Sequence, residues 1–172
     1  MSPKRRKGKG PAPGATRASK ALVALGVEHE LRPYELPPDA DESTLGEAAA
    51  RALEIEPGTA FKTLIALCDD EPVCAVVPVT GSLSLKALAA AAGAKRAVMA
   101  PLDRVERWTG YVKGGISPLG QLKPLRTFID GTAASYPHVH VSAGQRGLDL
   151  RIASADLFAA TGAISVSGLG DG

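Results

Sequence analysis

The sequence predicts a single mixed α/β domain, built from a barrel-like mixed β-sheet with peripheral helices. A chain of 172 residues is long enough for one hydrophobic core without disulfides or a structural metal. Its 45% hydrophobic and 22% charged residues are ordinary for a globular protein. Apolar β-branched runs and alanine-rich segments are mixed along the chain without the strict strand–helix alternation of a doubly wound fold.

Helices are predicted where apolar residues recur with helical spacing between capping residues. The first begins near Thr16, and Gly26 closes it as a C-terminal cap. Thr44 and Glu47 have the spacing of a capping box and open the second helix. Ser154 is expected to cap the last one. In chain order the expected helices cover residues 16–25, 44–53, 85–92, 101–107 and 154–160.

Strands are predicted from short apolar, β-branched runs bounded by turn residues. Residues 60–67 and 72–79 are two such runs separated by Asp69-Asp70-Glu71, which indicates a hairpin. The other extended segments expected in chain order are residues 27–36, 97–99 (as a buried strand), 126–129, 138–142 and 148–152.

Residues 1–15 are predicted to form a disordered basic arm, and residues 16–172 the folded domain. Residues 1–20 carry seven basic side chains and no acidic one, whereas the rest of the chain carries 13 basic and 18 acidic side chains. A basic arm on a mildly acidic body suits an electrostatic contact with nucleic acid. A solubilising tail is the alternative interpretation of the same charges.

Several functional classes lack support in the sequence. The longest strongly apolar run, near residues 88–92, is too short to span a bilayer, and no secretory signal is present, so we expect a cytoplasmic protein. Cys68 and Cys74 stand in apolar runs with a spacing that suits neither zinc nor a redox pair. His138 and His140 share a strand face but have no third ligand nearby. We therefore expect neither a metal nor a cofactor.

The most unusual segment is the stretch of residues 110–120, which contains four glycines and a proline. This composition predicts a loop whose main chain a ligand can approach closely. It matches neither the phosphate-loop nor the dinucleotide-binding pattern. Lys62 interrupts an apolar run, so it either binds an anion in a wet cleft or protects an edge strand. Ser142 and Asp149 are each only weak indications of a functional site. Their occurrence together with this loop strengthens that interpretation.

Four segments of the chain form a recognisable set, namely Phe61-Lys62-Thr63-Leu64, Gly81-Ser82-Leu83-Ser84-Leu85-Lys86, residues 110–121 and residues 141–149. Together they resemble the YbaK family of aminoacyl-tRNA deacylases, to which the editing domain of bacterial prolyl-tRNA synthetase is related. The resemblance covers about residues 17–165. Its most specific part is the Gly-Gly-Ile-Ser-Pro-Leu-Gly sequence of the loop, and it is strongest to the free-standing Cys-tRNA(Pro) deacylase branch.

This resemblance implies a fold of six or seven strands in a barrel-like sheet and hydrolytic removal of cysteine from the 3′ end of tRNA(Pro). The enzyme would act in trans with prolyl-tRNA synthetase, as a transient partner. We expect a monomer, because no long apolar stripe is left over once the predicted elements are packed.

The resemblance also assigns roles to residues. Lys62 would hold the terminal adenosine or its phosphate, Gly115 would present its backbone at the ester, and Ser142 would complete the catalytic set. The substrate-binding residues that it implies are Tyr34, Leu45, Thr63, Gly114, Ile116 and Asp149. Relatives tend to have an aromatic residue where this chain has Leu45, so a stacking contact is expected to be missing and the amino-acid specificity stays open.

The expected mechanism needs no protein nucleophile. An aminoacyl ester is already reactive, so positioning and stabilisation of the developing oxyanion can supply much of the rate. In the cysteinyl branch the thiol of the substrate would attack the carbonyl. A deacylase for Ala-tRNA(Pro) or another aminoacyl-tRNA, using a bound water, is the first alternative. A non-catalytic module that binds tRNA or oligonucleotide ends is the second, and a small-molecule binding domain is the third.

Overall fold

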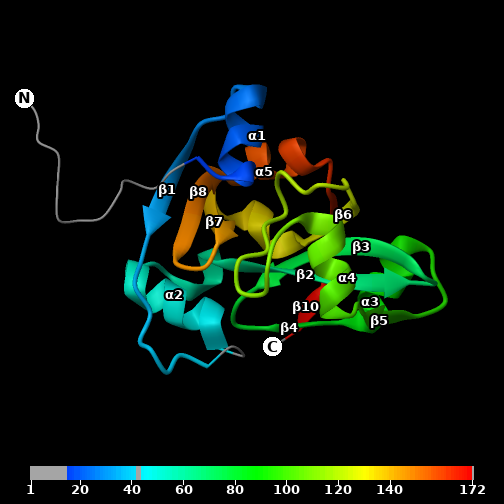
Figure 1. The fold of residues 1–172 in the computed structure, drawn as a ribbon. Helices are drawn as coiled ribbons and strands as arrows, with labels where there is room; N and C mark the ends of the chain where they lie inside the picture. Colours follow the sequence, from blue (N-terminus) through cyan, green and yellow to red (C-terminus); the bar gives the residue numbers. More distant parts are fainter. Residues whose placement is uncertain (1–14, 42–43, 172) are drawn as a thin grey trace, which may run out of the picture.

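The computed structural model describes residues 15–41 and 44–171. The basic arm expected over residues 1–15 lies, except for Ala15, outside the described residues. Helices and strands are intermixed along the described chain (Figure 1), which confirms the mixed α/β class predicted from the sequence. No helix in these two ranges combines the length and the apolarity needed to cross a membrane.

The strands form three separate sheets in the described chain and do not close into a barrel. Their bounds are β1 His29–Pro33, β2 Phe61–Cys68, β3 Glu71–Pro78, β4 Ser82–Leu83, β5 Ala97–Met99, β6 Arg126–Asp130, β7 His138–Gln145, β8 Leu148–Ala153, β9 Ile164–Val166 and β10 Gly170–Asp171. A three-stranded sheet has the order β1-β8-β7, a five-stranded sheet has the order β5-β2-β3-β6-β9, and β10 pairs with β4.

The helices lie around these sheets (Figure 1). The α-helices are α1 Arg17–Leu25, α2 Leu45–Leu53, α3 Leu85–Ala92, α4 Leu102–Thr109 and α5 Ser154–Thr161, and the short 3-10 helices are η2 Pro57–Thr59 and η3 Gly131–Ser135. The predicted start of α1 near Thr16 and its predicted C-terminal cap are confirmed, because Gly26 adopts the left-handed conformation. The structure adds an N-terminal cap, in which the Thr16 side chain accepts a hydrogen bond from the Ser19 N–H. The predicted β2–β3 hairpin is confirmed as well.

Alternation along β7 and β8 separates an apolar face from a polar face. Val139, Val141 and Ala143 of β7 are fully buried. Their neighbours on β8, Leu150 and Ile152, are at most 1% exposed. The residues between them point to the opposite face, because successive side chains of a strand alternate. That polar face carries His138, His140, Ser142, Asp149 and Arg151, and it is the face from which the site is built.

One apolar cluster holds the two larger sheets together. It combines Leu22 of α1, Phe61 and Ile65 of β2, Val141 of β7 and Leu157 of α5. A bridge between Ala60 and His140 brings the start of β2 against β7. The N-terminal half of β2, where Lys62 lies, is thereby placed beside the polar face of the three-stranded sheet.

Three local predictions were wrong in detail. Thr44 precedes α2 but makes no side-chain cap, because its hydroxyl donates to the Asp41 carbonyl. Ser154 is the first residue of α5 and donates to the Tyr136 carbonyl, so it does not act as the cap. Residues 97–99 form a partly exposed edge strand where a buried strand was expected.

Candidate active site

A cavity of about 320 Å³ opens where the three-stranded sheet, α2, the start of β2 and the glycine-rich loop meet. Such a volume lies at the small end of ligand pockets. Its lining residues are Tyr34, Leu45, Gly46, Ala49, Ala60, Phe61, Lys62, Thr63, Leu64, Val79, Lys113, Gly114, Ile116, Ser142 and Asp149. All the predicted site residues except Gly115 are in this set, although they come from six separate parts of the chain.

Gly115 is placed differently from the expectation. Its N–H donates to the Val112 carbonyl at 3.0 Å, which closes a turn, so this donor is already used. A Cβ atom on Gly115 would lie 2.7 Å from the Cα of Gln145. The residue therefore serves close packing of the loop on β7, and it does not line the cavity. Its neighbours Gly114 and Ile116 do.

The glycine-rich loop is held firmly by buried hydrogen bonds. The Tyr111 hydroxyl donates to the Leu119 carbonyl at 2.6 Å, and the Gln121 side chain donates to the Ser117 carbonyl at 3.0 Å. Gly144 has a φ of 108°, and a Cβ there would lie 2.7 Å from the Tyr111 ring. These contacts define the conformation of the loop, which contributes Lys113, Gly114 and Ile116 to the cavity lining.

Two ammonium groups lie at the cavity. Lys62 is half-buried on β2 between the buried Phe61 and Thr63, and it lines the cavity, which favours the anion-binding interpretation of this residue. Lys113 is exposed in the glycine-rich loop and lines the same cavity. Among the described residues, neither forms a salt bridge with a carboxylate. Both charges are available to an anionic group of a ligand.

Three oxygen-bearing side chains also line the cavity. Asp149 of β8 pairs with Ser142 of β7 in the antiparallel register, and Tyr34 follows β1. Burial raises the pKa of Asp149 to about 7, against the opposing effect of Arg32. Burial and the Asp149 charge raise the pKa of Tyr34 to about 12, so its hydroxyl stays protonated. A fourth oxygen, the buried Thr63 hydroxyl, has no hydrogen-bond partner among the described residues.

His140 lies on the same polar face of β7, two residues before Ser142, and does not line the cavity. It is 5% exposed, and burial, reinforced by Arg32 and Arg151, lowers its pKa to about 4. The ring is neutral at pH 7. No group of three His, Cys, Asp or Glu residues in the described ranges is arranged to hold a metal ion.

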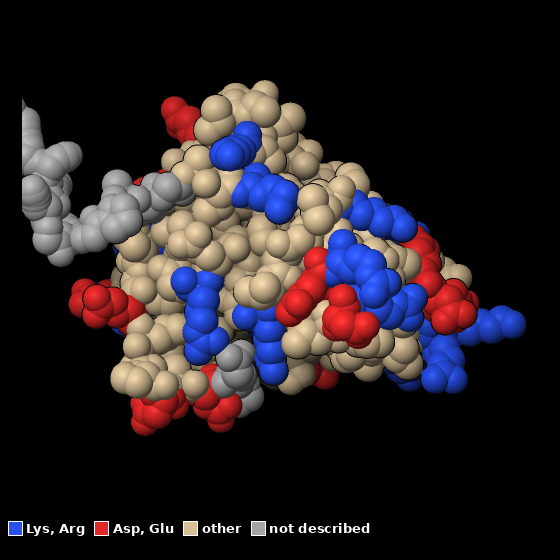
Figure 2. Space-filling model, in the orientation of Figure 1, with Lys and Arg blue, Asp and Glu red and all other residues tan. Residues whose placement is uncertain are grey.

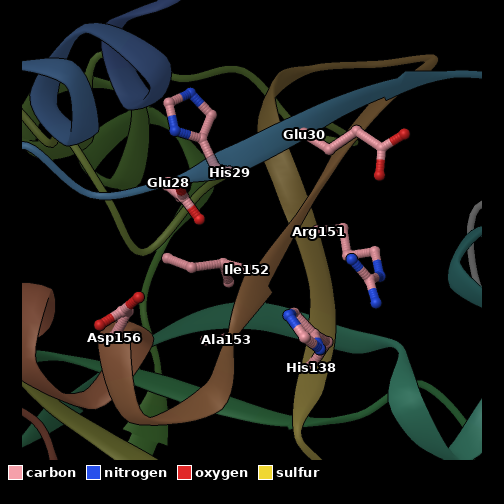
Figure 3. A pocket seen from close by; sticks show the side chains of 8 residues that line it. All are labelled: Glu28, His29, Glu30, His138, Arg151, Ile152, Ala153 and Asp156. Carbon is pink, nitrogen blue, oxygen red and sulfur yellow. The ribbon is translucent and has the colours of Figure 1, made fainter.

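A second cavity, of about 400 Å³, lies on the same sheet (Figure 3). Its lining residues are Glu28, His29, Glu30, His138, Arg151, Ile152, Ala153 and Asp156. Figure 3 shows acidic, basic and imidazole groups side by side around it. None of the predicted site residues lines it, and its mixed charges favour no particular ligand.

The family follows from a comparison with known proteins. Residues 39–160, which include every cavity residue except Tyr34, match the sequence profile of the aminoacyl-tRNA editing domain. The chain belongs to the aminoacyl-tRNA editing domain family. This confirms the family-level prediction drawn from the sequence segments.

Comparisons with individual proteins agree with this assignment. EbsC of Enterococcus faecalis, described as a candidate Cys-tRNA(Pro)/Cys-tRNA(Cys) deacylase, is 42% identical over 108 residues, which are 62% of this chain and 66% of EbsC. The crystal structure of a candidate trans-editing enzyme for prolyl-tRNA synthetase has 25% identity and a TM-score of 0.78, covering 94% of this chain and 99% of that one. The crystal structure of the hypothetical protein APE2540 shares the fold, with 24% identity, a TM-score of 0.78 and coverage of 91% and 100%.

Sequence reasoning missed Lys113 and most of the apolar wall of the site. A signal for the wall was present in α2, because Leu45 and Ala49 are four residues apart and share a helix face. Gly46 lets this helix approach Val79, the residue that follows β3, since a Cβ there would lie 2.5 Å from a methyl carbon of Val79. A lysine next to the paired glycines of the loop was the available signal for Lys113.

Proposed function

We propose that the protein is an editing hydrolase that cleaves the ester of mischarged aminoacyl-tRNA, with Cys-tRNA(Pro) as its substrate. The main observation in support is that Lys62, Gly114, Ser142 and Asp149, which come from separate elements, line the same cavity. Membership of the editing domain family supports the reaction, and the names of EbsC and of the prolyl trans-editing enzyme support the substrate.

Binding is derived from size and charge. A cavity of about 320 Å³ admits the aminoacyl end of the tRNA and leaves the body of the tRNA outside. Lys62 and Lys113 would bind phosphate or ribose oxygens of the terminal nucleotide as point charges. The apolar wall formed by Leu45, Ala49 and Val79 would contact the base or the amino-acid side chain without aromatic stacking.

The rate enhancement is assigned to positioning and to the backbone of the loop. As the ester carbonyl is attacked, negative charge develops on its oxygen. Gly114 and Ile116 line the cavity, and their N–H groups have no acceptor among the described residues, so we assign them as the donors to this oxygen. Gly115 supports this arrangement by holding the turn rather than by contacting the ester.

For a cysteinyl ester the substrate supplies its own nucleophile. The thiol sulfur forms a bond to the carbonyl carbon, the bond from that carbon to the ribose oxygen breaks, and the ribose oxygen takes up the proton released by the thiol. Water then opens the resulting thiolactone to give free cysteine. This route explains why the site contains no cysteine or histidine, since Cys74 is fully buried elsewhere and His140 does not line the cavity.

The test is deacylation of Cys-tRNA(Pro), Ala-tRNA(Pro) and Pro-tRNA(Pro) by wild type, by Lys62→Ala and by Lys95→Ala. We expect wild type to hydrolyse the cysteinyl ester fastest and Lys62→Ala to lose about tenfold or more, the cost of one charge-assisted contact. Lys95 is exposed and remote from the cavity, so its variant is the matched control. Hydrolysis of all three esters at the uncatalysed rate by wild type would refute the proposal.

Preference for Ala-tRNA(Pro) in the same assay would select the water-dependent alternative, because alanine has no thiol. The proposed action in trans with prolyl-tRNA synthetase is tested by adding the synthetase. If the two proteins form a transient complex on tRNA(Pro), the synthetase lowers the KM for Cys-tRNA(Pro) and leaves the KM for Cys-tRNA(Cys) unchanged. The comparisons do not favour a non-catalytic binding module.

A further inference from the structure

The most unusual group in the cavity is the carboxyl of Asp149. Its residue is only 9% exposed, yet it lines the cavity. No described residue forms a hydrogen bond with it, and no described Lys, Arg or His nitrogen lies within 4.0 Å of it. Buried carboxylates are normally paired, because an unpaired one loses its hydration without compensation. An Asp in this position therefore indicates a partner that arrives with the ligand.

The surroundings of Asp149 suit a cation with several donors. The Ser142 hydroxyl oxygen accepts the Gly144 N–H at 3.1 Å and has a second lone pair free. Tyr34 also lines the cavity, and its phenol lies near enough to Asp149 for the charge of that carboxylate to raise the pKa of Tyr34. The Ser142 hydroxyl, the Tyr34 hydroxyl and the Asp149 carboxylate thus provide three hydrogen-bond acceptors. This number matches the three N–H donors of an ammonium group.

Building on the proposed deacylase function, we propose that Asp149, with Ser142 and Tyr34, binds the free α-ammonium group of the aminoacyl ester. The site thereby selects aminoacyl esters with an unmodified amino group. N-acylated and α-hydroxy acyl esters lack the cation that the carboxylate requires and are excluded.

Electrostatics favours an ammonium over a ribose hydroxyl as the partner. With a neutral hydroxyl as partner, only the charge of Arg32, the cross-strand neighbour on β1, offsets the buried carboxylate. An ammonium in hydrogen-bond contact neutralises it directly, and charge-assisted hydrogen bonds are about twice as strong as neutral ones. Burial already destabilises the ionised carboxyl, as its pKa of about 7 shows, so the gain from a cationic ligand is large. Lys62 and Lys113 remain free for the phosphate end.

The experiment compares two esters on the same tRNA(Pro), one of cysteine and one of its α-hydroxy analogue, which replaces the ammonium with a hydroxyl of similar size. We expect wild type to favour the amino ester ~10- to 100-fold in kcat/KM, the range of a charge-assisted bond. Asp149→Asn should bring this ratio close to one. Asp70→Asn, in the exposed β2–β3 turn with a φ of 71° that asparagine tolerates, should keep the wild-type ratio.

The outcomes separate this proposal from the proposed function. If wild type hydrolyses both esters equally and Asp149→Asn slows both, the carboxylate serves another part of the ligand, such as the ribose, and the ammonium proposal is overturned while the deacylase function stands. If wild type hydrolyses neither ester, the function itself is refuted. Inhibition of wild type by amide-linked aminoacyl and hydroxyacyl adenosines provides a measurement that does not depend on the folding of a variant, and equal inhibition constants would also overturn the proposal.

Discussion

At the scale of single residues, the polar face of the three-stranded sheet holds two buried ionisable groups with opposite behaviour. Burial raises the pKa of Asp149 to about 7 and lowers that of His140 to about 4. Arg32 faces both groups and Arg151 faces His140, while Tyr34 lies close to Asp149. At pH 7 the His140 imidazole is therefore uncharged, and about half of the Asp149 carboxyl groups are ionised. A cationic ligand would shift Asp149 toward its ionised form.

The two groups predict opposing effects of pH on stability. Asp149 ionises near 3.8 when unfolded, so the folded state binds more protons between pH 4 and 7 and its contribution to stability falls as pH rises through that window. His140 protonates near 6.5 when unfolded, so its contribution rises with pH between 4 and 6.5. In wild type the two slopes oppose each other.

Substituting either residue should leave only the pH dependence of stability that comes from the other. Asp149→Asn should be more stable than wild type at pH 8, by at most about 4 kcal/mol from the pKa difference, and should lose this advantage near pH 4. His140→Gln should instead become less stable as pH rises from 4 to 7. Urea unfolding at pH 4.5, 6 and 8 measures both. Parallel stability curves for Asp149→Asn and wild type would contradict the assigned burial.

Thr63→Val should separate stability from activity. The Thr63 hydroxyl is buried and lacks a partner among the described residues, so the similarly shaped valine removes an uncompensated polar group. We expect the free energy of unfolding to rise by about 1 kcal/mol. If the hydroxyl binds the substrate, kcat/KM for Cys-tRNA(Pro) should fall at the same time. A destabilised variant with full activity would show that this hydroxyl has a structural partner in solution.

At the scale of elements, the glycine-rich loop and β7 act as one unit. Gly115 of the loop lies against the backbone of Gln145, and Gly144 of β7 lies against the ring of Tyr111. The absence of a side chain at each glycine allows the two segments to pack closely. The register shift in β7 between Ser142 and Gln145 falls at this contact. Ser142 still pairs regularly with Asp149, so alternation along β7 turns it to the polar face, and the shift affects only the residues that follow it.

Gly115→Ala should disturb this unit. Its Cβ would lie 2.7 Å from backbone atoms that cannot rotate away, so the loop must shift, at a cost of about 1–3 kcal/mol. Activity should fall further than stability explains, because Gly114 and Ile116 move with the loop. Gly93→Ala is the control, since it has a φ of 73° with no atom within 4 Å of the added Cβ, and it should retain full kcat. Thermal unfolding measures the stability of both variants, and deacylation rates show whether Gly115→Ala loses more activity than its loss of stability explains.

At the scale of the whole molecule, charge is distributed unevenly between the body and the N-terminal segment. The face in Figure 2 shows Lys and Arg side chains interspersed with Asp and Glu rather than one continuous basic stripe. Five basic residues lie within residues 1–15, which contain no acidic residue. General attraction to tRNA is therefore expected to depend on that segment, and selectivity for the 3′ end on the cavity.

Deleting residues 1–15 should weaken tRNA binding and make it less sensitive to salt. Each phosphate contact adds about 0.7–0.9 to the slope of log affinity against log salt, so the slope should become shallower when the basic residues are removed. Binding titrations between 50 and 200 mM salt, a range in which phosphate contacts dominate, measure this effect. An unchanged slope would assign the residues to solubility, and the rate at saturating tRNA should stay at the wild-type value in either case.

Local sequence signals predicted the elements well where the physical cause is local. The start of α1 near Thr16, its cap at Gly26, the β2–β3 hairpin and the helix of residues 85–92 depend on neighbours within a few residues, and all were confirmed. The short strands β4, β9 and β10 were missed because they exist only through pairing with distant segments.

The sequence by itself determined the mixed α/β class, the family and the identity of most cavity residues, because these are carried by local composition and by short segments that retain their pattern. Tertiary structure alone decided that the strands divide into three sheets, that Gly115 holds a turn and that Lys113 and α2 complete the cavity. It also decided the state of Asp149, since the pKa of a carboxyl depends on the burial and the charges that the folded chain brings around it.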